Sequence, residues 1–263
     1  MDPEQGARPT GAGGTIPRRD RGSARRLNPR DKPLHAAPDP VSRPQQLPPP
    51  WDALAWSQIA PTRHDRKARL FGASDEDRAV VCKDFSRPMR RPLARYPRKL
   101  LLRNEVRALR RLEGLPGVPP LLAAWPTGFV MGRVPGTRLS DLERGAVPTE
   151  VFDALDRLVA TIHARGVIIG DLHRRNILVD DSLDVHLVDF EMALVADEGL
   201  GRLARRQLLA MDRLAAARQR DQHGRPLSAD QQELLARPPL LRRVLASLKQ
   251  GRRRLLGRSS SKR

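Results

Sequence analysis

Three polar residues near the middle of the chain have the types and the spacing that phosphoryl transfer needs. Asp171 and Asn176 lie five residues apart in GDLHRRN, and Asp189 follows 13 residues later in LVDFE. An aspartate can accept the proton of an attacking hydroxyl, while an amide and a second carboxylate offer hard oxygen ligands to Mg²⁺. Each residue type alone is common in turns and at strand ends. Together, after an amphipathic helix, they predict a site for metal-assisted phosphoryl transfer.

A lysine and a glutamate earlier in the chain complete this chemistry. Lys83 lies among apolar residues in AVVCKDF, which has the pattern of a strand, and Glu105 lies in the helical stretch LLRNEVRAL. A buried ammonium needs a partner, and Glu105 can supply one. The pair would position the α and β phosphates of a nucleotide. The alternatives are a strand lysine that extends to solvent and an ordinary helix surface charge.

The elements that position these residues follow from hydrophobic periodicity. The predicted strands are 67–73 and 78–85, joined by a polar turn, then 121–125, 128–134 and two strands flanking the turn in ILVDDSLDVHLV. The predicted helices are 98–115, 148–165, 202–220 and 231–250. In helix 148–165 one apolar stripe contains Val151, Leu155, Leu158, Val159 and Ile162.

From about residue 66 to residue 195 the chain resembles the protein-kinase-like superfamily. IHARGVIIGDLHRRNILVDD is similar to the catalytic loops of compact bacterial kinases related to RIO kinases and lipopolysaccharide core kinases. DLHRRNIL and VDFE also resemble aminoglycoside and choline phosphotransferases. The resemblance implies a two-lobed α+β fold, with a small sheet-plus-helix N-lobe and a reduced helical C-lobe.

The resemblance also implies binding of ATP and Mg²⁺ between the lobes, with adenine against backbone groups from Met131 to Val134. The roles it assigns are catalysis by Asp171, Mg²⁺ ligation by Asn176 and Asp189, phosphate contact by Lys83 and ion pairing by Glu105. The expected domain organisation is a disordered Pro- and Arg-rich tail over 1–50, a kinase-like domain over 51–250 divided near residue 131, and a basic mobile tail over 251–263.

The chain departs from the family pattern at three positions near the site. Ile169 replaces the usual histidine, Gly170 replaces the arginine beside the catalytic aspartate, and Glu191 replaces the glycine of D-F-G. The first replacement is tolerable, since that histidine is mainly a packing element. The second indicates no control by activation-loop phosphorylation. The third favours the phosphotransferase-like relatives and adds a carboxylate near the metal.

The phosphate-covering loop also differs from the family pattern. No glycine-rich sequence precedes Lys83, and we expect Thr62, Arg63 and backbone amides to cover the phosphates instead. No A-P-E motif follows Asp189, so the peptide-binding platform is expected to be reduced.

The composition of the chain favours some classes of binding partner and excludes others. The net charge of +19 favours polyanions, although a compositional bias of the source genome explains the same excess of arginine. Aromatic residues make up only 3% of the chain and no recognition motif is present, so no specific nucleic acid is expected.

The single cysteine, Cys82, excludes a disulfide framework and a cysteine-based zinc site. No apolar run of membrane-spanning length and no secretory signal is present, which predicts a cytoplasmic protein, with peripheral contact of the basic tails at the inner membrane face left open.

The function predicted is transfer of the γ-phosphate of ATP to a hydroxyl acceptor, either a protein Ser/Thr or a lipopolysaccharide sugar. One alternative is a catalytically weak pseudokinase that acts as a nucleotide-binding scaffold. Another is a phosphotransferase for small molecules of the aminoglycoside or choline kind. The sequence leaves the acceptor open.

Overall fold

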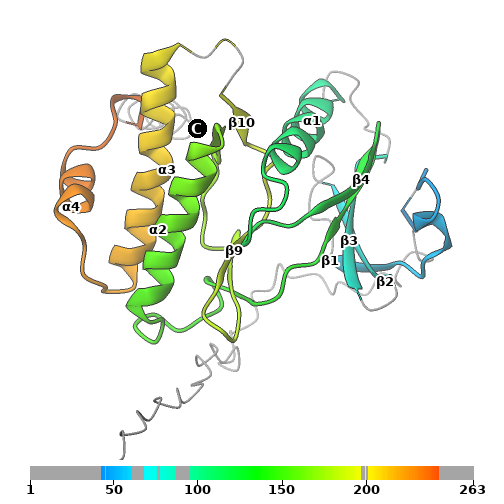
Figure 1. Ribbon diagram of the computed structural model, residues 1–263, viewed down its shortest axis with the longest axis horizontal. Helices are drawn as coiled ribbons and strands as arrows, with labels where there is room; N and C mark the ends of the chain where they lie inside the picture. Colours follow the sequence, from blue (N-terminus) through cyan, green and yellow to red (C-terminus); the bar gives the residue numbers. More distant parts are fainter. Residues whose placement is uncertain are drawn as a thin grey trace, which may run out of the picture.

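The structure is a computed structural model that describes residues 43–44, 46–60, 68–75, 78–86, 95–196, 199 and 201–242. These residues form two lobes of a mixed α and β fold (Figure 1). One lobe contains a five-stranded sheet and α1, and the other contains α2, α3 and α4. This is the α+β architecture that the sequence predicts.

The first lobe is an antiparallel sheet in the order β1-β2-β3-β5-β4. Its strands are β1 (Ser57–Ala60), β2 (Arg69–Asp75), β3 (Arg78–Asp84), β4 (Leu121–Trp125) and β5 (Gly128–Gly132), preceded by a short 3-10 helix, η1 (Trp51–Ala53). Helix α1 (Arg95–Arg111) lies between β3 and β4 in the sequence and contacts β4. The hairpin of β2 and β3 and the strands β4 and β5 are confirmed.

Alternation along β3 decides where its lysine points. Val80 and Cys82 belong to a small core on one face of the sheet, with Trp56 and Phe71. Val81 belongs to the main core on the other face. Since successive side chains of a strand point to opposite faces, Lys83 shares the face of Val81, which is turned toward α1 and the second lobe.

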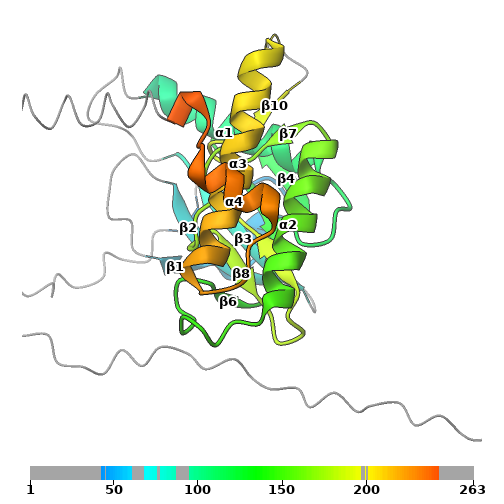
Figure 2. The ribbon, with the colours of Figure 1, turned by 90° about the vertical axis from the view of Figure 1, so that its left-hand side faces the viewer.

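The second lobe is built on α2 (Thr149–Ala164), whose predicted apolar stripe is buried. In Figure 1, α3 (Arg202–Gln222) lies between α2 and α4 (Ala229–Ala236), and in Figure 2, viewed from that side, α4 lies in front of α3. Two small sheets carry the loops: β7 (Val167–Ile168) pairs with β10 (Leu194–Val195), and β8 (Ile177–Val179) pairs with both β6 (Thr137–Arg138) and β9 (Val185–Leu187). All pairings are antiparallel.

The predicted helix over 231–250 is wrong as a single element. Helix α4 begins after Ser228, which forms a capping box with Gln231, and it ends at Ala236. Pro238 and Pro239 follow, and proline disfavours helical geometry at the residue before it and lacks the N–H that a helix needs. Strand β1 was not predicted, because its four residues show no clear alternation.

Several predictions fall outside the described residues. These are the mobile tail over 251–263, the phosphate-covering role of Thr62 and Arg63, and most of the disordered tail over 1–50, of which residues 43–44 and 46–50 are described. Within the described part of the chain, no helix is both long and apolar enough to cross a membrane.

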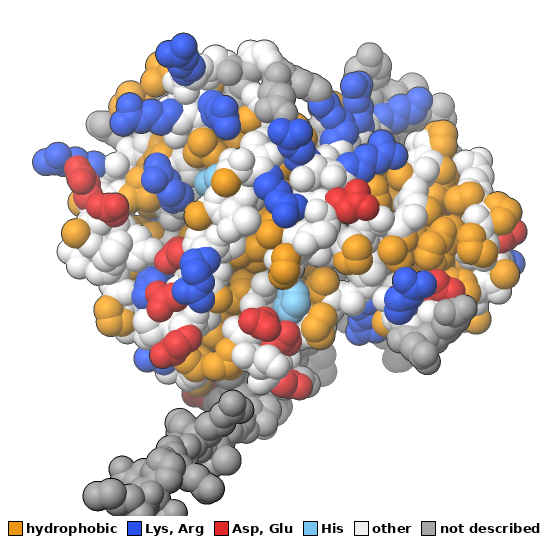
Figure 3. Space-filling view, in the orientation of Figure 1, with side chains coloured by type: hydrophobic (Ala, Val, Ile, Leu, Met, Phe, Trp, Pro, Cys, Tyr) orange, Lys and Arg blue, Asp and Glu red, His pale blue; other side chains and the backbone are white. Residues whose placement is uncertain are grey.

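Charge is unevenly distributed over the face shown in Figure 3. Lys and Arg side chains gather along its upper part, over the ends of α1 and α3, whereas most Asp and Glu side chains lie lower, over the second lobe. The excess of positive charge is therefore concentrated on part of this face.

Candidate active site

A cleft of about 430 Å³ separates the two lobes. Most of the residues singled out from the sequence line it, together with the glutamate after Phe190: Lys83, Met131, Val134, Asn176, Asp189 and Glu191. Residues of β1, β2, β3 and β5 and of the segment after β5 form one wall, and residues of β6, β8 and the segment after β9 form the other. One wall therefore belongs to the first lobe and to the segment that joins the lobes, and the other wall belongs to the second lobe.

Lys83 is the central cation of the cleft. Its Nζ donates hydrogen bonds to both carboxylate oxygens of Glu105, at 2.7 and 2.9 Å. The two residues are 5% and 0% exposed. The ion pair between strand and helix that the sequence predicts is therefore present, and it is buried.

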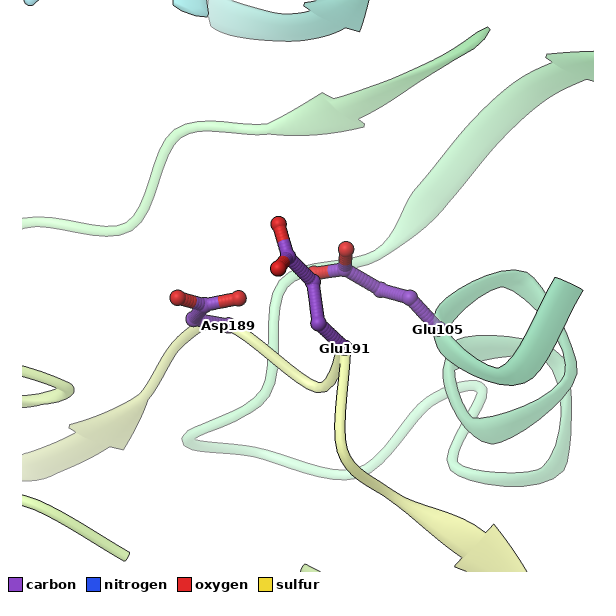
Figure 4. Close-up of side chains that lie close together, drawn as sticks. All are labelled: Glu105, Asp189 and Glu191. Carbon is purple, nitrogen blue, oxygen red and sulfur yellow. The ribbon is translucent and has the colours of Figure 1, made fainter. Parts of the chain in front are cut away.

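Two more carboxylates surround the same ammonium. Lys83 Nζ donates to Asp189 Oδ1 at 2.9 Å and lies 3.6 Å from Glu191 Oε1. Figure 4 shows the side chain of Glu105 extending from α1 toward those of Asp189 and Glu191 on the loop after β9. Oxygens of the three carboxylates lie within 4.8 Å of one another. They are hard ligands of the kind that Mg²⁺ prefers.

Burial and charge act in opposite directions on this cluster. Burial alone would lower the pKa of Lys83, but Glu105, Asp189 and Glu191 outweigh it and raise that pKa above its ordinary 10.5. The lysine is therefore held as the ammonium. Burial also raises the pKa of Glu105 from 4.5 to about 7, against the attraction of Lys83 and with the repulsion of the other two carboxylates.

The backbone of the D-F-E segment is fixed by α1 and by the core. Asp189 has a φ of 71°, which is uncommon for a residue other than glycine. The N–H of Phe190 donates to Glu105 Oε1 at 3.1 Å, and the Phe190 ring is buried. These two contacts hold Asp189 in the left-handed conformation that aims its carboxylate at Lys83.

The loop between β7 and β8 carries the first acid of the motif. Asp171 is exposed, and its backbone carbonyl accepts a hydrogen bond from the Asn176 side chain at 3.2 Å. Asn176 lines the cleft, whereas Asp171 is not among the described residues that line it. The structure thus brings Lys83, Glu105 and Asp189 into direct contact and places Asp171 at the edge of the same site.

Asp212 on α3 is a positioning residue that the sequence reasoning missed. Its carboxylate accepts hydrogen bonds from the backbone N–H groups of Ile169 and Gly170, at 2.8 and 3.0 Å. It also lies 3.0 Å from His163 Nε2, and it is only 3% exposed. The available signal was a lone acid between apolar residues in LLAMDRLAAA, because such an acid needs buried donors.

Gly170 has a steric reason to be glycine. Its φ is 78°, and a Cβ at this position would collide with the backbone carbonyl oxygen of Met192. An arginine cannot occupy this position without moving the D-F-E segment. The glycine at this position therefore reflects close contact between the two loops.

No family model matches the chain. A protein named "Probable SapB synthase" from Streptomyces coelicolor is 32% identical over 147 residues, covering 44% of this chain and 16% of the synthase. A solved structure of the Rio2 kinase from Chaetomium thermophilum, in an ADP/Mg²⁺-phosphoaspartate complex, is 19% identical with a TM-score of 0.50, over 67% of this chain and 57% of that chain. A structure of monomeric WbdD has a TM-score of 0.42 at 24% identity, over 54% of this chain and 37% of that chain.

The chain therefore spans less than two thirds of the length of each of these proteins. The two lobes, the cleft between them and the overlap with Rio2 agree on the architecture. The chain has a protein-kinase-like fold.

Proposed function

We propose that this chain is an ATP- and Mg²⁺-dependent phosphotransferase that moves the γ-phosphate to a hydroxyl acceptor. The observation that carries the proposal is the buried contact of Lys83 with Glu105 and Asp189 at the inner end of the cleft. A buried, permanently charged ammonium facing a cleft is suited to contact the phosphates of a nucleotide. The Rio2 structure with ADP and Mg²⁺ supports the same choice of ligands.

The donor set fits a magnesium ion. Asp189 and Asn176 both line the cleft, and Glu191 contributes a second carboxylate close to that of Asp189. All are hard oxygen donors. Bound there, Mg²⁺ would neutralise negative charge on the phosphates.

The remaining residues have roles in binding and proton transfer. The residues from Met131 to Val134 line the cleft, and adenine would lie against their backbone groups. Asp171 accepts the proton of the acceptor hydroxyl while that oxygen bonds to the γ-phosphorus. The bond from the γ-phosphorus to the bridging oxygen breaks, and ADP leaves. Asp212 keeps the backbone before Asp171 in place through its hydrogen bonds to Ile169 and Gly170.

Nucleotide binding tests the metal assignment before any acceptor is known. A fluorescent ATP analogue should bind the full chain in the presence of Mg²⁺ and more weakly in its absence. Asp189→Ala should remove the dependence on Mg²⁺, and Asp181→Ala, which alters an exposed turn, should bind like the wild type. Binding by Asp189→Ala with an unchanged Mg²⁺ dependence would contradict the assignment.

A nucleotide-binding scaffold without turnover is the second candidate. It is favoured by the exposed position of Asp171 at the edge of the site. A scaffold would bind the nucleotide with Mg²⁺ and form no ADP with any acceptor. Formation of ADP that requires Asp171 would exclude it.

A further inference from the structure

Three arginines are among the residues that line the cleft, and the part that they line is called its outer end. Arg133 follows β5, Arg138 lies in β6, and Arg175 lies on the loop that carries Asp171 and directly precedes Asn176. All three are exposed. They come from both walls of the cleft, so a ligand that enters it passes between guanidinium groups.

The backbone holds two of these arginines on neighbouring segments. Arg138 pairs with Leu178 in the ladder of β6 and β8, and Leu139 donates to Ile177 O at 2.9 Å. The next residue donates to the carbonyl of Arg174 at 3.1 Å. The segments bearing Arg138 and Arg175 are therefore tied together, and their relative position does not depend on a ligand.

No carboxylate within the described part of the chain pairs with these arginines. Their side chains form no hydrogen bond or ion pair there, and Asp141 is the one acidic residue lining the cleft beside them. The other two acidic residues that line the cleft, Asp189 and Glu191, lie beside Lys83. The cleft is thus polarised, with carboxylates at its inner end and an excess of guanidinium groups at its outer end.

Neighbouring like charges raise the electrostatic free energy of a site unless an anion lies between them. A guanidinium also donates two parallel hydrogen bonds to a phosphate or carboxylate, so arginine binds such groups specifically. Single exposed arginines on a surface need no ligand. Here three arginines line one cleft, and two of them lie on segments that are hydrogen-bonded to each other. This arrangement is suited to binding an anionic ligand.

We infer that the outer end of the cleft binds an anionic group of the acceptor, so that the acceptor carries a phosphate or carboxylate in addition to its hydroxyl. The inference rests on the proposed function, because Lys83 and the metal ligands take the phosphates of ATP at the other end. Arg138 and Arg175 are the specificity-determining residues, and Arg133 adds to the positive electrostatic potential of the site. A neutral acceptor would leave these guanidinium groups without a partner.

The first test measures anion binding without any turnover. The full chain, saturated with Mg²⁺ and a non-hydrolysable ATP analogue, is titrated with inorganic phosphate while the side-chain ¹⁵Nε signals of its arginines are recorded. The signals of Arg138 and Arg175 should shift and saturate. The signal of Arg144, which is exposed but does not line the cleft, is the control. Equal, non-saturating shifts at Arg144 would overturn the anion site.

The second test measures the acceptor. Extract is separated by anion exchange into retained and unretained fractions, and each receives the enzyme with ATP labelled at the γ-phosphate. Label should enter the retained fraction. Arg138→Glu/Arg175→Glu should lower this transfer by about tenfold or more, since it replaces two charge-assisted contacts with repulsion, while Arg144→Glu should not.

The outcomes separate this inference from the proposed function. Transfer into the unretained fraction that the double variant leaves unchanged would overturn the inference and support the kinase. Saturable phosphate binding without any transfer would overturn the kinase and support an anion site in this cleft. Transfer into the retained fraction that both arginine variants leave unchanged would overturn the role of these arginines.

Discussion

Lys83 shows how a single residue determines the chemistry and the stability of the site together. It lies almost wholly out of solvent, with three carboxylates around its ammonium group. Burial of a charge is costly, and the pairing offsets that cost only while both partners are present. The site is therefore sensitive to removal of either member of the pair.

We expect Lys83→Met to lower the free energy of unfolding by about 3–5 kcal/mol, because Glu105 is then a buried carboxylate without its cation. Urea denaturation of the variant and the wild type measures this difference. Lys83→Met/Glu105→Met should regain most of the stability and no transfer activity. Equal stability of the single variant and the wild type would contradict the burial of the pair.

Cys82 lies next to Lys83 in β3, on the opposite face of the sheet. Burial raises the pKa of its thiol above its ordinary 9.0, so the neutral thiol is the folded form. The thiol therefore contributes stability below pH 9 that is lost as the pH rises beyond that value, because only the unfolded chain releases the proton readily. The free energy of unfolding should fall more between pH 8 and pH 10 in the wild type than in Cys82→Ala. An equal fall would show that the thiol ionises freely in the folded state.

At the scale of elements, α3 and the D-F-E segment together position the loop of Asp171. Asp212 on α3 accepts hydrogen bonds from the backbone just before Asp171, and the carbonyl oxygen of Met192 lies close to Gly170. The loop is thus held from two sides by elements that follow it in the sequence.

Asp212→Ala should slow transfer strongly and lower the free energy of unfolding by about 2 kcal/mol or more, because buried N–H groups lose their acceptor. The affinity for the nucleotide should change little, since Asp212 does not line the cleft. Asp221→Ala removes an exposed acid of the same helix and serves as the control. If both variants behaved alike in transfer assays, Asp212 would have no positioning role.

Gly170→Ala should be more damaging than Gly114→Ala. Both glycines have a positive φ, 78° and 71°, so both variants pay the left-handed penalty of about 1–2 kcal/mol. Only at Gly170 does the new Cβ also collide with Met192, whereas nothing lies within 4 Å of it at Gly114. Thermal unfolding and transfer assays compare them. A similar loss in the two variants would mean that the loops separate easily.

At the scale of the molecule, the parts that the sequence predicts are those with local signals. Alternation identified β3 and the strands around the polar turn, and helical periodicity identified the buried face of α2. The partnership of Lys83 and Glu105 followed from the cost of a buried charge. Asp212 was missed because its partners lie more than 40 residues away and depend on how α3 packs. The approach of Glu191 to Lys83 likewise depends on the left-handed backbone of Asp189, for which the sequence carries no signal.

The whole molecule combines a kinase-like fold with a reduced second lobe and a strong positive charge. The arginines at the mouth of the cleft and the basic upper part of the face in Figure 3 give the molecule a surface that favours anions. The domain limits near residues 51, 131 and 250 stay predictions.

The most direct test of the central claim is transfer of labelled γ-phosphate from ATP by the full chain, with Mg²⁺, into cell extract separated into protein, lipid and small-molecule fractions. We expect label in one fraction, lost in both Asp171→Ala and Asp189→Ala and kept in Asp181→Ala. Label that persists in the first two variants, or no label from the wild type with either Mg²⁺ or Mn²⁺, would contradict the assignment of a phosphotransferase.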